Sequence, residues 1–232
     1  MKQYVRKLSE AFRNKNNTHQ DGLDWSVDWN RQHPNPTREE LVEFWRGDKL
    51  KNITPPSSAF PAGFDESAFL KRLWPLLAST SVVEIGCGFG RLASAFPPEI
   101  YLGLDINPEA IEKAKIYQPG YRFEVIDFGA SYPKADLYIA YTVFLHIDDK
   151  NMAGLNRRLK DVCRQLLIVE IMDPTFRELP STVPNFVRAR SDYQRFFEAF
   201  DLEFEIRRPY QHYPGTDISY LLFTNRMTKN RE

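Results

Sequence analysis

The feature that most constrains the fold of this chain is a change of pattern near residue 80, where short apolar runs begin to alternate with amphipathic stretches. The runs have the length of strands and the stretches have helical spacing. Such alternation is typical of an α/β fold, a doubly wound, mostly parallel sheet with helices on both faces. We predict strands over 81–85, 100–105, 121–126, 136–141 and 165–171, and helices over 90–96, 108–117, 149–162 and 190–200.

The last part of the chain departs from this alternation. Two further apolar runs, 202–206 and 218–223, follow each other without a helical stretch between them. A connection that lacks a helix joins antiparallel strands. The sequence therefore predicts a seven-stranded sheet whose last strand is antiparallel.

Residues 1–65 are expected to form a helical N-terminal extension, and residues 66–232 the main domain. Thr37-Arg38-Glu39-Glu40 has the form of a capping box and predicts a helix over about 37–46. A second helix is expected after Asp65. Aromatic side chains in and beyond the extension can form a lid over a substrate, although core packing uses them in the same way: Trp25, Trp29, Phe44, Trp45, Phe60, Phe64, Phe176 and Phe186.

Charge and composition exclude several classes of partner. Lys plus Arg and Asp plus Glu number 31 each, so no net field draws the chain to nucleic acid or to an anionic membrane. Cys87 and Cys163 match neither a disulfide framework nor a metal-ligand spacing. No apolar run is long enough to span a bilayer. We expect a cytoplasmic protein with no nucleic-acid partner and no integral membrane segment, although the basic first twenty residues also fit a surface-seeking or transit-like helix.

Three glycines follow the first predicted strand, in Glu84-Ile85-Gly86-Cys87-Gly88-Phe89-Gly90. Glycine between a strand and a helix lets backbone N–H groups and the helix N-terminus approach a ligand. A dinucleotide fingerprint needs a further glycine where this chain has Arg91, so the loop departs from the NAD pattern. The loop indicates a nucleotide-like ligand other than a dinucleotide.

Two acids stand at the ends of the next two predicted strands. Asp105 lies where a carboxylate can accept both hydroxyls of a ribose, with a helix N-cap as the alternative. Ile106 is placed to cover one face of a base. Asp127, followed by Phe128, can bind an exocyclic amine, with a turn residue as the alternative. Ligands bind at the carboxyl ends of strands in an open α/β sheet, so these positions predict one nucleoside site.

The glycine loop and the two acids together resemble the class I S-adenosylmethionine-dependent methyltransferases over about residues 66–225. The first motif of that family matches the segment from Glu84 to Gly90, its ribose acid matches Asp105 and its adenine-binding acid matches Asp127. The resemblance implies S-adenosylmethionine as cofactor and S-adenosylhomocysteine as product.

The resemblance also implies roles for other residues near the loop. It places Gly86 and Gly88 close to the methionine part of the cofactor, while Glu84 either orders the loop or contacts the cofactor. Tyr141 and Thr142, at the end of the fourth strand, are expected to line the methionine pocket, with sheet packing as the alternative.

A histidine follows the fourth predicted strand, in Tyr141-Thr142-Val143-Phe144-Leu145-His146. Many small-molecule members of the family carry a histidine in this segment, so the resemblance makes His146 the candidate general base. The alternatives are a structural histidine or one that only contacts the substrate. Glu170 and Asp173 can reach the same cleft, but without the acid-amide pair of catechol-type members we expect no obligatory metal. Arg91, His33 and His212 are weaker candidates for substrate contacts.

These features favour transfer of a methyl group to an oxygen of a small-molecule or saccharide acceptor. The Asn-Pro-Pro-Tyr tetrapeptide of amino-group nucleic-acid methyltransferases is absent, since Tyr141-Thr142-Val143-Phe144 stands there. The alternatives are N-methylation of a small molecule, a non-catalytic scaffold that binds S-adenosylmethionine, and a nucleotide-linked oxidoreductase, which Arg91 opposes.

Overall fold

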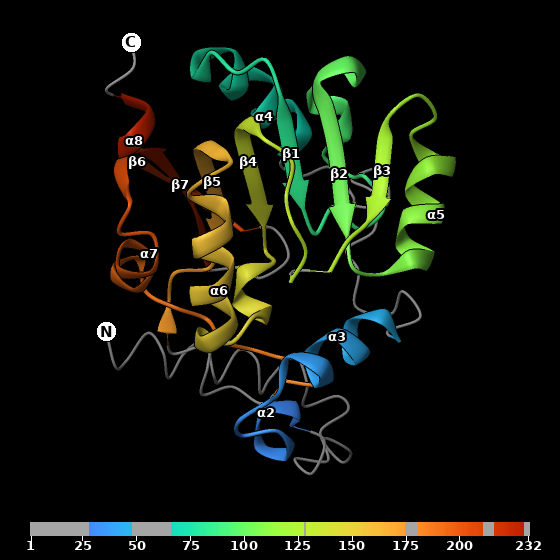
Figure 1. Cartoon of the computed structure of the whole chain (residues 1–232), viewed down its shortest axis with the longest axis vertical. Coiled ribbons are helices and arrows are strands. Elements are labelled where there is room, and N and C mark those ends of the chain that lie inside the picture. The colour runs from blue at the N-terminus through green and yellow to red at the C-terminus, as the bar shows by residue number, and fades with distance from the viewer. Residues whose placement is uncertain (1–27, 48–65, 128, 175–180, 211–215, 230–232) are drawn as a thin grey trace.

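The computed structural model describes residues 28–47, 66–127, 129–174, 181–210 and 216–229, and these contain a single seven-stranded sheet (Figure 1). Its order is β3-β2-β1-β4-β5-β7-β6. The first five strands are parallel, while β7 runs antiparallel to both β5 and β6. The predicted architecture is thus confirmed. The strands are β1 (Val82–Ile85), β2 (Tyr101–Asp105), β3 (Arg122–Val125), β4 (Ala135–Tyr141), β5 (Cys163–Glu170), β6 (Phe200–Pro209) and β7 (Asp217–Asn225).

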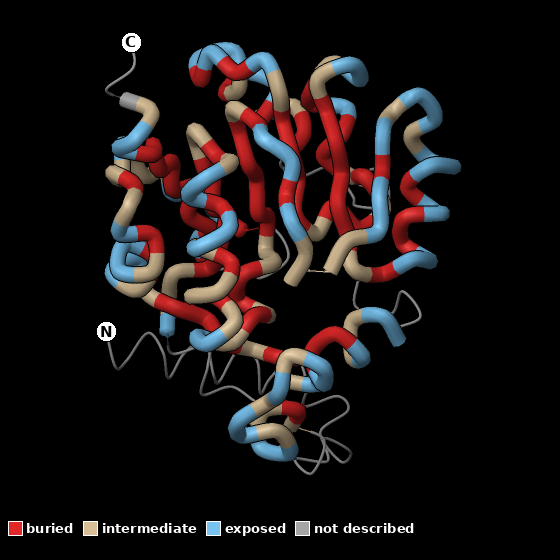
Figure 2. The backbone as a smooth tube through the Cα atoms, in the orientation of Figure 1, coloured by how far each residue is buried: buried red, intermediate tan, exposed pale blue. Residues whose placement is uncertain are grey.

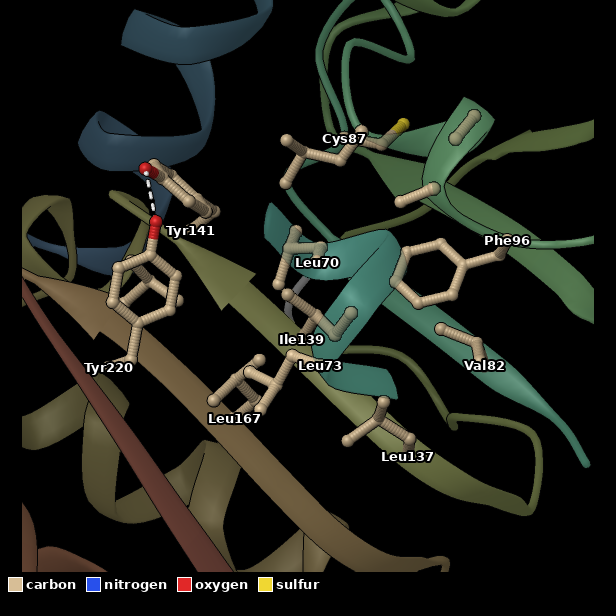
Figure 3. Close-up of a cluster of buried hydrophobic side chains, with 14 of the residues drawn as sticks. Leu70, Leu73, Val82, Cys87, Phe96, Leu137, Ile139, Tyr141, Leu167 and Tyr220 are labelled. Atoms are coloured by element: carbon tan, nitrogen blue, oxygen red, sulfur yellow. Dashed lines mark hydrogen bonds between the residues drawn. The ribbon is translucent and has the colours of Figure 1, made fainter. Parts of the chain in front are cut away.

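Helices cover both faces of the sheet because successive strand residues point to opposite sides. In β4, Leu137, Ile139 and Tyr141 join one buried cluster while Tyr138 and Ala140 join another. The first cluster includes side chains of α4 (Glu66–Leu73) and α5 (Pro108–Tyr117), and Figure 3 shows its centre. The second includes side chains of α6 (Asp149–Leu159) and α7 (Arg190–Phe196). The central strands are buried almost throughout (Figure 2).

The N-terminal helices lie at the carboxyl ends of the parallel strands (Figure 1). The capping-box prediction is confirmed in α3 (Arg38–Arg46), where the Thr37 side chain accepts from Glu40 N and the Glu40 carboxylate accepts from Thr37 N. Helix α2 (Trp29–Gln32) precedes it. Trp29 and Leu41 pack with Phe186 in a small separate cluster. The extension therefore adds a cover to that edge of the sheet.

The helix predicted over 90–96 is wrong. Gly90 has a φ of +71°, which does not continue into a right-handed helix, and only a 3-10 turn, η5 (Ala93–Ala95), forms before Pro97. Phe96 is extended, as the residue before a proline tends to be. The glycine loop is consequently not followed by an α-helix whose dipole could face a ligand.

Other boundaries moved by a few residues. Helix α4 ends at Leu73 and continues as the 3-10 turn η4 (Trp74–Leu77), because Pro75 cannot continue the ladder of the α-helix. The helix predicted over 190–200 ends at Phe196, and β6 begins at Phe200. The remaining short elements are η6 (Pro98–Ile100), η7 (Phe144–His146) and α8 (Arg226–Lys229). Across the described ranges, no helix is long and apolar enough to cross a membrane.

Candidate functional site

A cavity of about 160 Å³ lies at the carboxyl ends of β1, β2 and β4, next to α3, which contributes Trp45 to its lining. Its wall combines the glycine loop, the ends of β2 and β4, the turn η7 and one side chain of α3. Among the lining residues are Trp45, Glu84, Gly86, Gly88, Arg91, Asp105, Ile106, Asn107, Ile126, Tyr132, Tyr141, Thr142, Val143, His146 and Ile147. Most of the predicted site residues are therefore brought together.

The glycine loop is held in a backbone conformation that favours glycine. Gly86, Gly88 and Gly90 have φ values of +70°, +52° and +71°. The backbone N–H of Gly86 donates to Leu104 O at 2.7 Å, which ties the loop to the neighbouring strand. A Cβ atom on Gly86 would lie 2.3 Å from Cγ2 of Val143. Both conformation and close approach thus exclude a side chain at this position.

Asp105 is almost fully buried and anchors the glycine loop. Its Oδ2 accepts from Gly88 N at 2.8 Å and its Oδ1 accepts from Asn107 N at 2.8 Å. Burial raises the pKa of this carboxyl, while the backbone hydrogen bonds act against that rise. The N-cap of α5 is Asn107, whose Oδ1 accepts from Ala110 N. The N-cap alternative for Asp105 is therefore wrong, and the Asn107-Pro108 pair was the sequence signal for the true cap.

Glu84 is both satisfied locally and part of the cavity wall. The Tyr101 hydroxyl donates to its Oε2 at 2.5 Å. Desolvation by burial raises the pKa of Glu84 to about 8, so the side chain is mostly neutral near pH 7. Glu84 can therefore both order the glycine loop and contact a ligand in the cavity, so the two roles expected from the sequence do not exclude each other.

The residues that follow β3 do not all face the cavity. Ile106 and Ile126 line the cavity, whereas Asp127 is not among the lining residues and forms an ion pair with Arg38 of α3, at 2.5 Å from Nη2 to Oδ1. The same Oδ1 accepts from Gly129 N at 2.7 Å. Partial burial would raise the pKa of Asp127, but this hydrogen bond and Arg38 together lower it. Phe128 lies outside the described residues.

A buried polar cluster closes the side of the cavity next to β4. The Tyr141 hydroxyl donates to Glu66 Oε1 at 2.6 Å and lies 3.2 Å from the Tyr220 hydroxyl, as Figure 3 shows for the two tyrosines. Arg91 forms an ion pair with Glu66 and its guanidinium lies 4.7 Å from the centre of the Tyr141 ring. Arg91 is therefore a buried, paired cation rather than a solvated one. Nothing local in the sequence marked Glu66 as its partner.

His146 lines the cavity from η7, the turn that follows β4. Its Nδ1 is 2.6 Å from Pro184 O, which fixes the tautomer with hydrogen on Nδ1 and a lone pair on Nε2. The Trp45 ring is tilted over the imidazole, with the centroids 4.6 Å apart. Burial lowers the pKa of His146 to about 4, and the hydrogen bond to Pro184 only partly opposes this. His146 is thus neutral near pH 7.

The other sequence candidates lie elsewhere. His33 stacks on Trp29, with ring centroids 4.2 Å apart, and His212 is outside the described residues. Glu170 is buried and its Oε1 accepts from backbone N–H groups of residues 143–145. The part of the chain that the structure describes contains no cluster of three side chains suited to a metal ion.

Comparisons with known proteins agree with this geometry. A family model described as a methyltransferase domain matches residues 83–166. A search of the curated proteins found no match. Magnesium protoporphyrin IX methyltransferase from Synechocystis PCC 6803, solved with S-adenosylmethionine bound, is 13% identical with a TM-score of 0.58, over 81% of this chain and 96% of that one.

Two further solved structures share the fold. One, reported for the conversion of a disulfide bond into a thioacetal group during echinomycin biosynthesis, is 18% identical with a TM-score of 0.61, over 84% of this chain and 96% of that one. The other, a SAM-dependent methyltransferase from Methanosarcina mazei, is 14% identical with a TM-score of 0.56, over 66% of this chain and 96% of that one.

Proposed function

We propose that this chain, which carries a methyltransferase domain of the class I S-adenosylmethionine-dependent type, transfers a methyl group from S-adenosylmethionine to an oxygen of a small-molecule or saccharide acceptor. The observation that carries the proposal is one cavity lined by the glycine loop, by Asp105 and by His146. The residues proposed to bind the nucleoside and the candidate proton acceptor therefore line the same cavity.

The cofactor end of the cavity is formed by Gly86, Gly88, Asp105 and Ile106. Gly88 N and Asn107 N donate to different oxygens of Asp105, and each oxygen has two lone pairs, so the carboxylate keeps acceptor capacity for ribose hydroxyls. Ile106, with Ile126 nearby in the wall, offers an apolar surface for a base.

Four further residues have assigned roles in this proposal. Glu84 and Tyr141 face the methionine part of the cofactor, as both line the cavity. Asp127 is assigned to the exocyclic amine, and Phe128 to a contact beside it through its ring or its backbone. For Asp127 this requires sharing its carboxylate with Arg38, so we expect a smaller effect on affinity than from Asp105.

The acceptor end is formed by Trp45, Val143, His146 and Ile147. S-adenosylmethionine supplies a methyl group already activated on a positively charged sulfur, so the chain's task is to align the nucleophile and exclude water. Trp45 and Ile147 provide apolar surface beside His146. We assign small or flat acceptors to this end because Trp45 covers it.

His146 supports an oxygen acceptor. Its Nε2 lone pair can accept a hydrogen bond from a hydroxyl and take the proton as the new C–O bond forms; the S–CH3 bond of S-adenosylmethionine would break in the same step, with S-adenosylhomocysteine as the leaving group. With a pKa of about 4 the imidazole is a weak base, so orienting the hydroxyl is its larger contribution. A neutral amine needs no proton removed before it attacks, which makes a nitrogen acceptor the second candidate.

Calorimetry tests the cofactor, and methyl transfer tests the reaction. We expect S-adenosylmethionine and S-adenosylhomocysteine to bind and NAD not to bind; binding of NAD alone, or of none of them, would overturn the proposal. Labelled S-adenosylmethionine offered with phenols, saccharides and amines should then give labelled product with a hydroxyl compound. Cofactor binding without transfer to any class would favour the scaffold alternative.

Two histidine variants separate the role of His146 from a general effect. His146→Ala should leave affinity for S-adenosylhomocysteine nearly intact and lower turnover by about tenfold or more. His33→Ala is the matched control, since His33 stacks on Trp29 and is not among the cavity-lining residues. Normal turnover in His146→Ala would remove this residue from the reaction.

A further inference from the structure

The turn that carries His146 is held at its N–H groups by one buried acid. Oε1 of Glu170, the last residue of β5, accepts from Val143 N at 2.9 Å, Phe144 N at 2.8 Å and Leu145 N at 3.4 Å. Glu170 has no exposed surface. These N–H groups begin a 3-10 turn and would otherwise lack a partner inside the turn. Glu170 therefore satisfies the start of η7.

The carbonyl side of the same turn is held by a buried cation. Arg188 is 1% exposed; its Nη1 donates to Phe144 O at 2.8 Å and its Nη2 to Ile147 O at 2.6 Å. Its Nε and Nη2 also donate to Asp149 Oδ1, at 3.0 and 2.7 Å. The planar fork of arginine can reach all three acceptors at once.

Backbone from the same segment completes the contacts. Phe186 N donates to Leu145 O at 2.6 Å, and Pro184 O accepts from Nδ1 of His146. The residues 184–188 thus run along the turn and set the imidazole tautomer. Since η7 is not part of the sheet, these contacts determine where His146 points.

We propose that Glu170 and Arg188 are positioning residues that hold the turn 143–147 from its two sides and so aim Nε2 of His146 into the cavity. The catalytic role of this positioning rests on the proposed function, because Nε2 of His146 contributes to catalysis only if a methyl acceptor binds in the cavity. Neither residue is among those that line the cavity, so both act through His146.

The test follows the imidazole by NMR and needs neither cofactor nor acceptor, with His146→Gln identifying the resonance. In the wild-type protein the pKa of His146 should be about 4. Glu170→Ala removes the acceptor of three N–H groups, so the imidazole should leave Pro184 O, become solvated and titrate nearer 6.5.

Glu170→Gln should restore the behaviour of the wild type. Burial raises the pKa of Glu170 to about 8, so the neutral side chain that glutamine resembles is the main form near pH 7. Asn225→Ala is the matched control: Asn225 is 1% exposed and donates to two backbone carbonyls, Lys160 O and Cys163 O, away from the cavity. It should lower the melting temperature without moving the pKa of His146.

A second variant covers the case in which Glu170→Ala fails to fold. Arg188→Lys keeps the charge but loses the fork, and should also raise the pKa of His146. A folded Glu170→Ala, or failing that a folded Arg188→Lys, whose His146 titrates as in the wild type would overturn the proposal. Calorimetry of the wild-type protein with S-adenosylhomocysteine distinguishes failure of the proposed function from failure of this proposal. Lack of binding would contradict the proposed function and would leave the positioning of His146 by Glu170 and Arg188 untouched.

Discussion

The contacts between the glycine loop and Asp105, at the cofactor end of the cavity, join residues that are close in sequence, whereas the contacts around His146, at the acceptor end, join distant segments. Gly88 N reaches Asp105 across 17 positions. His146 meets Pro184 across 38 positions, and the Trp45 ring of α3 lies over the same imidazole, with the centroids 4.6 Å apart. The glycine loop and Asp105 are therefore a property of one β-loop-β unit, and the surroundings of His146 exist only once the whole domain has folded.

This difference predicts how each end of the cavity responds to substitutions. The cofactor end depends on backbone conformation and close approach, so a single added atom should disrupt it. The acceptor end depends on buried polar contacts from several segments, so its failures should appear first in the state of His146. Variants at the two ends can separate these behaviours.

The largest effect is expected from Gly86→Ala. The new Cβ would overlap Val143 at 2.3 Å, and alanine is strained at a φ of +70°. We expect affinity for S-adenosylhomocysteine to fall by about a hundredfold or more, measured by calorimetry. Gly120→Ala is the control, because Gly120 has a φ of +101° but no heavy atom within 4 Å of the added Cβ. Gly120→Ala should lower the melting temperature and leave affinity for S-adenosylhomocysteine unchanged. Equal losses of affinity in both variants would show that backbone strain, and not the overlap with Val143, causes the loss.

Asp105→Ala should have the next largest effect, a loss of cofactor affinity of about tenfold or more. The variant removes the proposed ribose acceptor and also the anchor of Gly88. Asp136→Ala is matched to it, since Asp136 accepts from Thr80 N at 2.8 Å at the amino end of β4. Unchanged affinity in Asp105→Ala would leave Asp105 with a structural role only.

Four of the residues predicted for the cofactor could be grouped from the sequence because their signals are local. Gly86, Gly88, Asp105 and Ile106 all line the cavity, as the spacing of strand and loop indicated. The parallel strands and the antiparallel last strand also followed from the alternation of apolar runs and helical stretches and from its end after α7. The failure was the helix after Gly90, where a positive φ and a nearby proline outweighed the helical pattern.

The acceptor end was predicted only in part because its partners are set by tertiary contacts. His146 was found in the segment that follows β4, but neither Pro184 nor Trp45 carried a signal that would pair it with this histidine. Asp127 shows the same limit: its position at a strand end was readable, while its ion pair with Arg38 was not.

The two ends should also respond to pH with opposite sign. His146 has a folded pKa of about 4 against 6.5 in the unfolded chain, so it lowers the free energy of unfolding as pH falls from 6.5 towards 4. Glu84 has a folded pKa of about 8 against 4.5, so its contribution is lost as pH rises from 4.5 through 8.

Denaturant unfolding of two variants tests this contrast. His146→Gln should reduce the loss of stability between about pH 6.5 and 5 by about 1 kcal/mol, less than the full shift implies because the side chain is partly exposed. Glu84→Gln should reduce the loss of stability as pH rises between about 4.5 and 8 and leave the profile below about pH 4.5 unchanged. A His146→Gln profile parallel to the wild type would mean that the imidazole is solvated in the folded protein.

The smallest effect is expected where one helix bridges the two ends. Helix α3 reaches the cofactor side through Arg38 and Asp127 and the acceptor side through Trp45. The Arg38 and Asp127 side chains are 39% and 23% exposed, and such ion pairs contribute about 1 kcal/mol or less. Arg38→Met should therefore change affinity for S-adenosylhomocysteine by about threefold at most.

Lys115→Met provides the comparison for Arg38→Met, since Lys115 pairs with Glu112 on the exposed side of α5 at 2.8 Å. If α3 is held mainly by the packing of Leu41 with Trp29 and Phe186, both variants should bind S-adenosylhomocysteine almost as the wild type does. Arg38→Met could instead weaken binding tenfold while Lys115→Met does not. That result would mean that the ion pair between Arg38 and Asp127 couples α3 to the binding of the adenine base. The cofactor end would then depend on a distant segment too, and the contrast between the two ends would hold only for the glycine loop and Asp105.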